Sequence, residues 1–196
     1  MTSYPTPDPM PGKPLFHRRQ ALQFGLAAMA IGLTPRWGMS HQRSASAPKR
    51  SLDLYHTHTG ERLKTVYWAD GQYVSEALVG FNHLLRDYRT DDMRPIDPQL
   101  LDLLHALGHA VDAPYAFHIV SAYRSPATNA YLRQHRQGVA KDSQHMYGRA
   151  VDFYLPKREL AVVRRAAVRL QRGGVGYYPK GHFLHVDTGP VRSWSV

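Results

Sequence analysis

The residues best suited to chemistry in this chain are two histidines and an aspartate. His145 and Asp152 lie seven positions apart, and His185 follows 33 positions after the aspartate. Two imidazoles and one carboxylate, with room for a water, match the ligand set of a catalytic zinc site, whereas structural zinc sites are usually closed by four ligands, mostly thiolates. The chain has no Cys, so a thiolate site is excluded and the pattern favours a catalytic metal.

The same three residues also have an ordinary interpretation. The chain contains 12 His, and a lone histidine is more often a hydrogen-bonded polar group than a metal ligand. Asp152 could equally cap an element or form an ion pair. The spacing of His145 and Asp152 alone is therefore weak evidence for a metal.

The spacing constrains how the three residues are positioned. We expect His145 in or just after a loop and Asp152 on a strand, with Gly148 allowing a sharp bend between them. A helix over 145–152 would also place both groups on one face, so the secondary structure is left open. On a strand, His185 shares a face with Asp187, whereas His182 points to the other side unless a bulge intervenes.

Hydrophobic periodicity and turn residues predict the surrounding elements. Helices and strands follow one another without regular alternation, which predicts an α+β fold. Asp97 followed by Pro98 is a typical helix start. We expect strands at 52–55, 62–68, 117–123, 150–155, 175–178 and 182–187, and helices at 74–89, 98–111, 125–137 and 156–172.

The run Ser143–Asp152, with the pattern Ser-x-His-x-x-Gly-x-Ala-x-Asp, resembles the zinc D-Ala-D-Ala peptidase family, in the superfamily that groups lysostaphin-type and hedgehog-type folds. The runs Phe81–Arg89, Gly173–Pro179 and His185–Pro190 further resemble its MepK-like (YcbK-like) branch of exported murein endopeptidases, over about residue 16 to Trp194. The resemblance implies a single domain whose small antiparallel sheet, flanked by helices, carries one Zn²⁺ on His145, Asp152 and His185.

The run Ser121–Ser125 adds a further candidate to this set. The resemblance implies that Arg124 faces the reacting carbonyl, where a guanidinium can stabilise charge growing on an amide oxygen. We expect Arg124 and Ser143 to contact substrate. The alternative is a helix-capping turn at Ser125 and Pro126 with Arg124 in solvent.

The general base is harder to assign. Many relatives place Glu three residues before the last histidine ligand or a second His two residues before it, and this chain has His182 and Phe183 there. Asp187 or His182 could take the proton. Asp187 could instead orient the His185 ring or stabilise the turn after its strand.

The formal net charge of +10 over 196 residues would favour polyanions or a substrate with several carboxylates. No basic run exceeds two residues and no nucleic-acid reader motif occurs, so no nucleic-acid partner is expected. We expect peptidoglycan as the partner and a monomer.

Residues 1–47 are predicted to be a signal and linker, and 48–196 the zinc peptidase domain. Arg18 and Arg19 precede an uncharged stretch, 21–33, that is shorter than the ~20 residues of a membrane span. This resembles a twin-arginine export signal, which predicts a periplasmic protein without a transmembrane span in the mature chain. The sequence does not decide whether the signal is cleaved near 45–47, cleaved near 38–40 or retained as an anchor. A basic tail without a signal function is a further alternative.

The predicted function is zinc-dependent cleavage of peptide crosslinks in bacterial peptidoglycan, as a murein endopeptidase. Two alternatives stay open: an L,D- or D,D-carboxypeptidase acting on stem peptides, and a cell-wall binding module without turnover. The sequence does not choose between L,D- and D,D-bonds.

Overall fold

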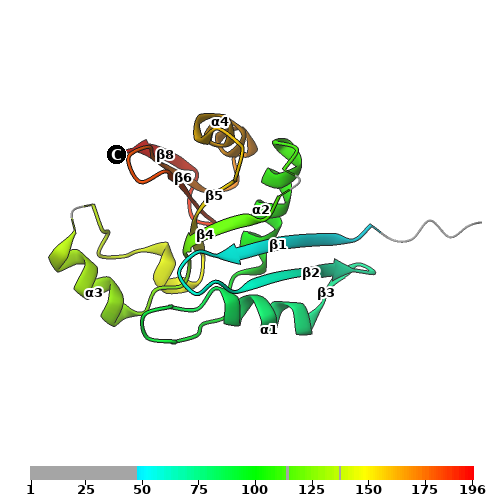
Figure 1. Ribbon diagram of the computed structural model, residues 1–196, viewed down its shortest axis with the longest axis horizontal. Helices are drawn as coiled ribbons and strands as arrows, with labels where there is room; N and C mark the ends of the chain where they lie inside the picture. The colour runs from blue at the N-terminus through cyan, green and yellow to red at the C-terminus, as the bar shows by residue number, and fades with distance from the viewer. Residues whose placement is uncertain (1–47, 114, 137) are drawn as a thin grey trace, which may run out of the picture. The chain divides into compact units, whose positions relative to one another are not determined.

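The computed structural model describes residues 48–196 except 114 and 137 (Figure 1). The predicted export signal and its cleavage sites, within 1–47, lie outside the described residues. In chain order the elements are β1 (Arg50–His56), β2 (Arg62–Ala69), β3 (Gln72–Tyr73), α1 (Ser75–Leu84), α2 (Pro98–Ala110), β4 (Phe117–Ser121), α3 (Pro126–His135), the short 3₁₀ helix η1 (Gln144–Tyr147), β5 (Ala150–Tyr154), α4 (Leu160–Leu170), β6 (Gly174–Tyr178), β7 (Phe183–Asp187) and β8 (Arg192–Ser195).

The strands form one eight-stranded sheet in the order β3-β2-β1-β4-β5-β7-β6-β8. The α+β class is confirmed, but the expected small antiparallel sheet is wrong, because the sheet is larger and mixed. β1 pairs in parallel with β4, and β6 pairs in parallel with β8. The first parallel pair joins the N-terminal hairpin to the centre of the sheet, where β5 lies between β4 and β7.

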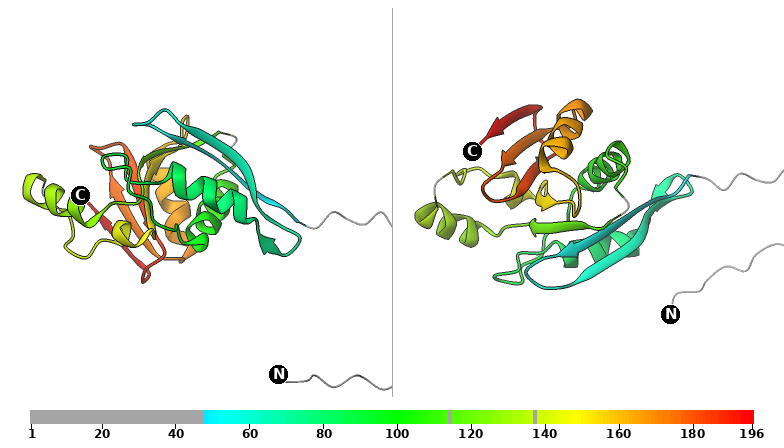
Figure 2. Two further views of the ribbon diagram at one scale, coloured as in Figure 1. Left: turned by 90° about the horizontal axis from the view of Figure 1, so that it is seen from below. Right: turned by 45° about the horizontal axis from the view of Figure 1, so that its top comes forward.

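Three of the described helices pack on the sheet, and α1 does so against β2. α2 packs against β1 and α4, and α4 packs against β6 and β7; the two helices lie side by side in Figures 1 and 2. α2 starts as predicted, with the Asp97 carboxylate accepting from Gln99 N and Pro98 in the first turn. Its buried face consists of five leucines: Leu100, Leu101, Leu103, Leu104 and Leu107.

Two helices are shorter in the structure than the sequence predicted. The helix expected over 74–89 ends at Leu84, because the next residues fold around the buried Asp87, whose backbone N–H donates to Asp92 O. The helix expected from Pro156 starts at Leu160, because Lys157 has φ 60° and cannot continue a right-handed helix.

The short strands β3 and β8 were not predicted. β3 extends the N-terminal hairpin, which one carboxylate connects to α2. Asp102 accepts hydrogen bonds from Arg50 Nη1 at 2.7 Å, Tyr67 OH at 2.8 Å and Tyr73 OH at 2.7 Å. These hydrogen bonds fix the open end of the hairpin, opposite the β1–β2 turn, on the helix.

Among the described residues, no helix has both the length and the apolar composition that crossing a bilayer requires.

Candidate metal centre

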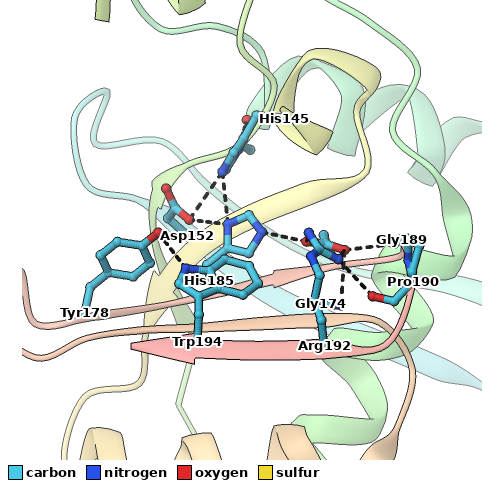
Figure 3. A network of polar contacts seen from close by, with 11 residues as sticks. His145, Asp152, Gly174, Tyr178, His185, Gly189, Pro190, Arg192 and Trp194 are labelled. Atoms are coloured by element: carbon cyan, nitrogen blue, oxygen red, sulfur yellow. Dashed lines mark hydrogen bonds and ion pairs between the residues drawn. The ribbon is translucent and has the colours of Figure 1, made fainter. Parts of the chain in front are cut away.

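His145, Asp152 and His185 come together at the middle of the sheet (Figure 3). His145 is on η1, Asp152 on β5 and His185 on β7. Asp152 and His185 are direct partners in the antiparallel β5–β7 register, so their side chains lie on one face. All three are buried, with 3%, 8% and 7% of their surfaces exposed.

The separations of the three donor atoms suit a metal ion. His145 Nε2 is 3.2 Å from His185 Nδ1, and Asp152 Oδ1 is 2.8 Å from His185 Nδ1 and 3.3 Å from His145 Nε2. Ligands about 2.0–2.2 Å from a tetrahedral ion are separated by about 3.3 Å. Two nitrogens and one oxygen also form the donor set of an open zinc site, so these residues fit such an ion.

The second nitrogen of each ring has its own acceptor, which fixes the tautomer. His145 Nδ1 donates to the Ala122 carbonyl at 2.6 Å, and His185 Nε2 donates to Asp187 Oδ2 at 2.9 Å. The remaining nitrogens, His145 Nε2 and His185 Nδ1, both lie against Asp152 Oδ1, where a cation could replace a proton. Acceptors of this kind orient the histidines of metal sites and make them better ligands.

Burial and the neighbouring charges shift the ionisation of all three groups. Burial lowers the pKa of His145. Burial alone would lower the pKa of His185 as well. Hydrogen bonds to Asp152 and Asp187 outweigh burial there and raise that pKa to about 9. Burial would raise the pKa of Asp152, yet the two imidazoles hold it well below its usual range. Asp152 therefore stays a carboxylate beside the two rings, where its charge can hold a cation in place of the proton on His185.

Gly148 shapes the segment between His145 and Asp152. η1 ends at Gly148, which has φ 67°, and a Cβ there would lie 2.5 Å from the Pro95 carbonyl oxygen. A side chain is excluded both by the backbone conformation and by this contact. Of the two arrangements that the sequence left open, the structure has a short 3₁₀ turn followed by a strand.

Asp187 has the geometry of a residue that orients His185. Its side chain is fully buried and accepts hydrogen bonds from His185, Gly174 N, Gly189 N and both terminal nitrogens of Arg192. Burial would raise its pKa, but these donors hold it well below the usual range. A carboxylate so fully bonded is a weak proton acceptor, so the contacts favour the orienting role over that of a base.

His182 lies apart from this cluster. It precedes β7 in an exposed turn with φ 53°, and no hydrogen bond or ion pair joins its side chain to the three candidate ligands within the described part of the chain. The bulge that would bring it to their side of β7 is absent from the β5–β7 register.

Arg124 lies beside the three ligands. Its backbone N–H donates to the His145 carbonyl at 3.2 Å. Its guanidinium makes one long contact, 3.4 Å to Asn129 Oδ1, and its buried Nε has no hydrogen-bond partner in the structure. Burial lowers the pKa of Arg124, and Asp152 partly opposes that effect. A buried cation with free donors is suited to an anionic or carbonyl group.

Ser125 and Ser143 are the two serines that the sequence singled out near Arg124 and His145. Ser125 caps α3, with its Oγ accepting from Thr128 N at 3.2 Å, so the capping alternative holds for Ser125 although Arg124 is not in solvent. Ser143 precedes η1, is 9% exposed and makes no side-chain capping bond.

Sequence reasoning missed three residues around His185. Trp194 on β8 lies 5.3 Å from the His185 ring, centroid to centroid, and donates from Nε1 to Tyr178 OH at 3.0 Å, as Figure 3 shows. Arg192 forms the 2.7 Å ion pair with Asp187. An aromatic residue in the otherwise polar run 192–195 was the available signal, but only the parallel β6–β8 pairing gives it a position.

Comparison with known proteins agrees with this geometry. A family model described as peptidoglycan L,D-endopeptidase MepK matches residues 44–194. The chain is 38% identical over 179 residues to the peptidoglycan L,D-endopeptidase MepK of Escherichia coli (strain K12), covering 91% of this chain and 97% of that relative. It is 36% identical over 180 residues to the probable peptidoglycan L,D-endopeptidase MepK of Haemophilus influenzae, covering 91% and 95%. The resemblance predicted from the sequence is confirmed, and this chain belongs to the peptidoglycan L,D-endopeptidase MepK family.

Proposed function

We propose that this protein is a zinc-dependent endopeptidase that hydrolyses L,D-peptide crosslinks in bacterial peptidoglycan. The observation that carries the proposal is the convergence of His145, Asp152 and His185 on one point. Membership of the family and the names of the relatives support the choice of peptidoglycan and of an L,D-bond. One Zn²⁺ per chain follows from the one set of three donors found within residues 48–196 as the structure describes them.

The roles of the residues follow from their contacts. His145 Nε2, His185 Nδ1 and Asp152 Oδ1 would hold the ion. A bound zinc ion polarises a carbonyl and lowers the pKa of a coordinated water. Asp187 and the Ala122 carbonyl keep the two rings in the tautomers that face the ion. Arg124 would donate to the scissile amide oxygen as negative charge develops there, and Ser143 would contact the bound peptide beside it.

The cellular setting belongs to the same proposal. Residues 48–196 would form the peptidase domain, and Arg18 and Arg19 before the uncharged stretch 21–33 support export to the periplasm by the twin-arginine pathway. A monomer would act there on the peptidoglycan network.

A second candidate function is binding of the cell wall without turnover. It is favoured by the contacts of Asp187, which is saturated with donors, and by the exposed position of His182. Neither predicted base is free beside the candidate ligands. Retained affinity for sacculi with no hydrolysis in the presence of zinc would support this alternative.

The experiment is digestion of purified sacculi followed by mass spectrometry of the released muropeptides. We expect the zinc-loaded protein to release peptides cut at L,D-crosslinks, chelation to abolish release, and added zinc to restore it. Asp152→Asn should be inactive, because one ligand to the ion is lost. Asp53→Asn is the matched control, since the Asp53 side chain pairs with Arg62 on the hairpin and is not one of the candidate ligands.

The outcomes separate the candidates. Products cut at D,D-bonds, or only trimmed stem peptides, would contradict the proposed bond and favour the carboxypeptidase alternative. Hydrolysis that persists unchanged in chelator, or in Asp152→Asn, would overturn the metal-dependent mechanism.

A further inference from the structure

A stack of three side chains beside Arg124 has no role in the proposed mechanism. The Tyr88 ring is parallel to the His58 ring, with centroids 4.2 Å apart and planes 9° apart. The Arg89 guanidinium carbon lies 4.0 Å from the centroid of the same Tyr88 ring. Two groups this close to one ring cannot share a face, so Tyr88 lies between His58 and Arg89.

One buried carboxylate, Asp87, joins the backbone that carries the stack to the backbone next to Arg124. Asp87 Oδ1 accepts from Arg89 N at 3.1 Å, and Asp87 Oδ2 accepts from Ser125 N at 2.9 Å. The backbone is joined a second time where Tyr123 N donates to Leu85 O at 3.0 Å. The segment after α1 therefore lies against the segment that carries Arg124, at the end of the sheet where the β1–β2 turn and α3 are found (Figure 1).

The charge of this cluster is not neutralised. Arg136, which follows α3, also lies close enough for its charge to act on His58. Among the residues that the structure describes, no carboxylate lies within ion-pair distance of Arg89 or Arg136, whereas Arg86 pairs with both Glu61 and Asp91. Arg89 and Arg136 are exposed. Arg89 is close enough for its charge to lower the pKa of both His58 and Arg124, after the larger effect of burial. The exposed Arg89 therefore adds a second positive charge near Arg124.

The chemistry of a stacked guanidinium indicates its ligand. Stacking on an aromatic ring restricts the guanidinium while leaving its N–H edge free, and that edge matches the two oxygens of a carboxylate. Peptidoglycan stem peptides carry free carboxylates close to their crosslinking amides. We propose that Arg89, held on Tyr88, binds a free carboxylate of the stem peptide and so aligns the scissile amide with the metal centre.

This inference rests on the proposed function, and the test distinguishes the two. Two soluble crosslinked muropeptides are compared, one with its free carboxylates and one in which they are converted to primary amides. The unmodified protein should have a KM about tenfold lower for the carboxylate form. Arg89→Gln should raise the KM for that form about tenfold and leave kcat, and the KM of the amide form, within about twofold.

Arg164→Gln is the matched control, because Arg164 also lies over a tyrosine ring, 5.0 Å from Tyr177, but on α4. It should keep the preference of the unmodified protein. If the zinc-loaded unmodified protein cleaves neither substrate, the proposed function fails. If it cleaves both equally well, or if Arg89→Gln keeps the full preference for carboxylate, the carboxylate site alone is refuted. Melting temperatures of both variants establish that they are folded.

Discussion

At His185, two carboxylates contact one imidazole, and they differ in what surrounds them. Asp152 Oδ1 lies 2.8 Å from Nδ1, in the triangle of candidate ligands, whereas Asp187 Oδ2 lies 2.9 Å from Nε2 and is also bonded to Arg192. The first carboxylate can share a cation with the ring, and the second can only orient it. Asp152 was predicted from its spacing to His145, and Asp187 from the strand alternation around His185. The sequence could not decide whether Asp187 is a base or orients the ring, because that distinction depends on Arg192 from another strand.

Asp187→Asn tests this distinction at the scale of one residue. An amide can donate to His185 Nε2 and so favour the tautomer that carries a proton on Nδ1, where the ion should bind. We expect zinc affinity to fall about 10–100-fold, measured by competition with a chelating dye, with Asp53→Asn as the control. Were Asp187 the general base instead, zinc affinity would be unchanged while kcat at saturating zinc collapsed.

At the scale of elements, the sequence predicted strands and helices with local signals but not the strand pairings that join distant segments. The strands β1 and β2 and the start of α2 were predicted because their signals, alternating side chains and the Asp97–Pro98 cap, lie within a few residues. The parallel pairings of β1 with β4 and of β6 with β8 were missed, since each joins segments far apart in the chain. β8 therefore places Trp194 beside His185, a position that a single aromatic residue in a polar run could not predict by itself.

The β6–β8 pairing gives a prediction for Gly176. A Cβ at Gly176 would lie 2.6 Å from two atoms of the Trp194 indole, so Gly176→Ala must displace the ring and break its bond to Tyr178. We expect a loss of about 1–3 kcal/mol in unfolding free energy and lower activity, because Trp194 packs on His185. Denaturant unfolding and tryptophan fluorescence measure these effects.

Gly108→Ala is the control for this substitution. Gly108 is inside α2, and its Cβ would meet Phe117 at an ordinary 3.4 Å. Alanine there should be neutral or stabilise the helix by up to about 1 kcal/mol. Unaltered unfolding and fluorescence in Gly176→Ala would contradict the account of the β6–β8 pair.

At the scale of the whole molecule, stability should depend on pH through His56. This side chain is fully buried and its Nε2 has no partner in the structure. Burial, with a smaller effect from His58, lowers its pKa to about 4 from the ordinary 6.5. The unfolded chain therefore binds a proton more readily between these values, so the stability present above pH 6.5 is lost as the pH falls toward 4.

Denaturant unfolding at pH 7.5 and pH 5 measures this contribution. We expect His56 to account for about 2 kcal/mol of the loss between these two pH values. His56→Asn, which keeps an acceptor for His58 N but no titrating ring, should be less stable at pH 7.5 and lose correspondingly less on acidification. Equal losses in both proteins would exclude His56 as the source.

The opposition of Asp152 and His185 across β5 and β7 has a consequence for how the protein acquires its ion. A slip of one residue between these strands would turn one of the two side chains to the far face of the sheet, and the donor triangle would never close. Zinc capture during refolding should therefore lag behind collapse and coincide with correct strand alignment. Zinc binding would therefore report when β5 and β7 reach their native register.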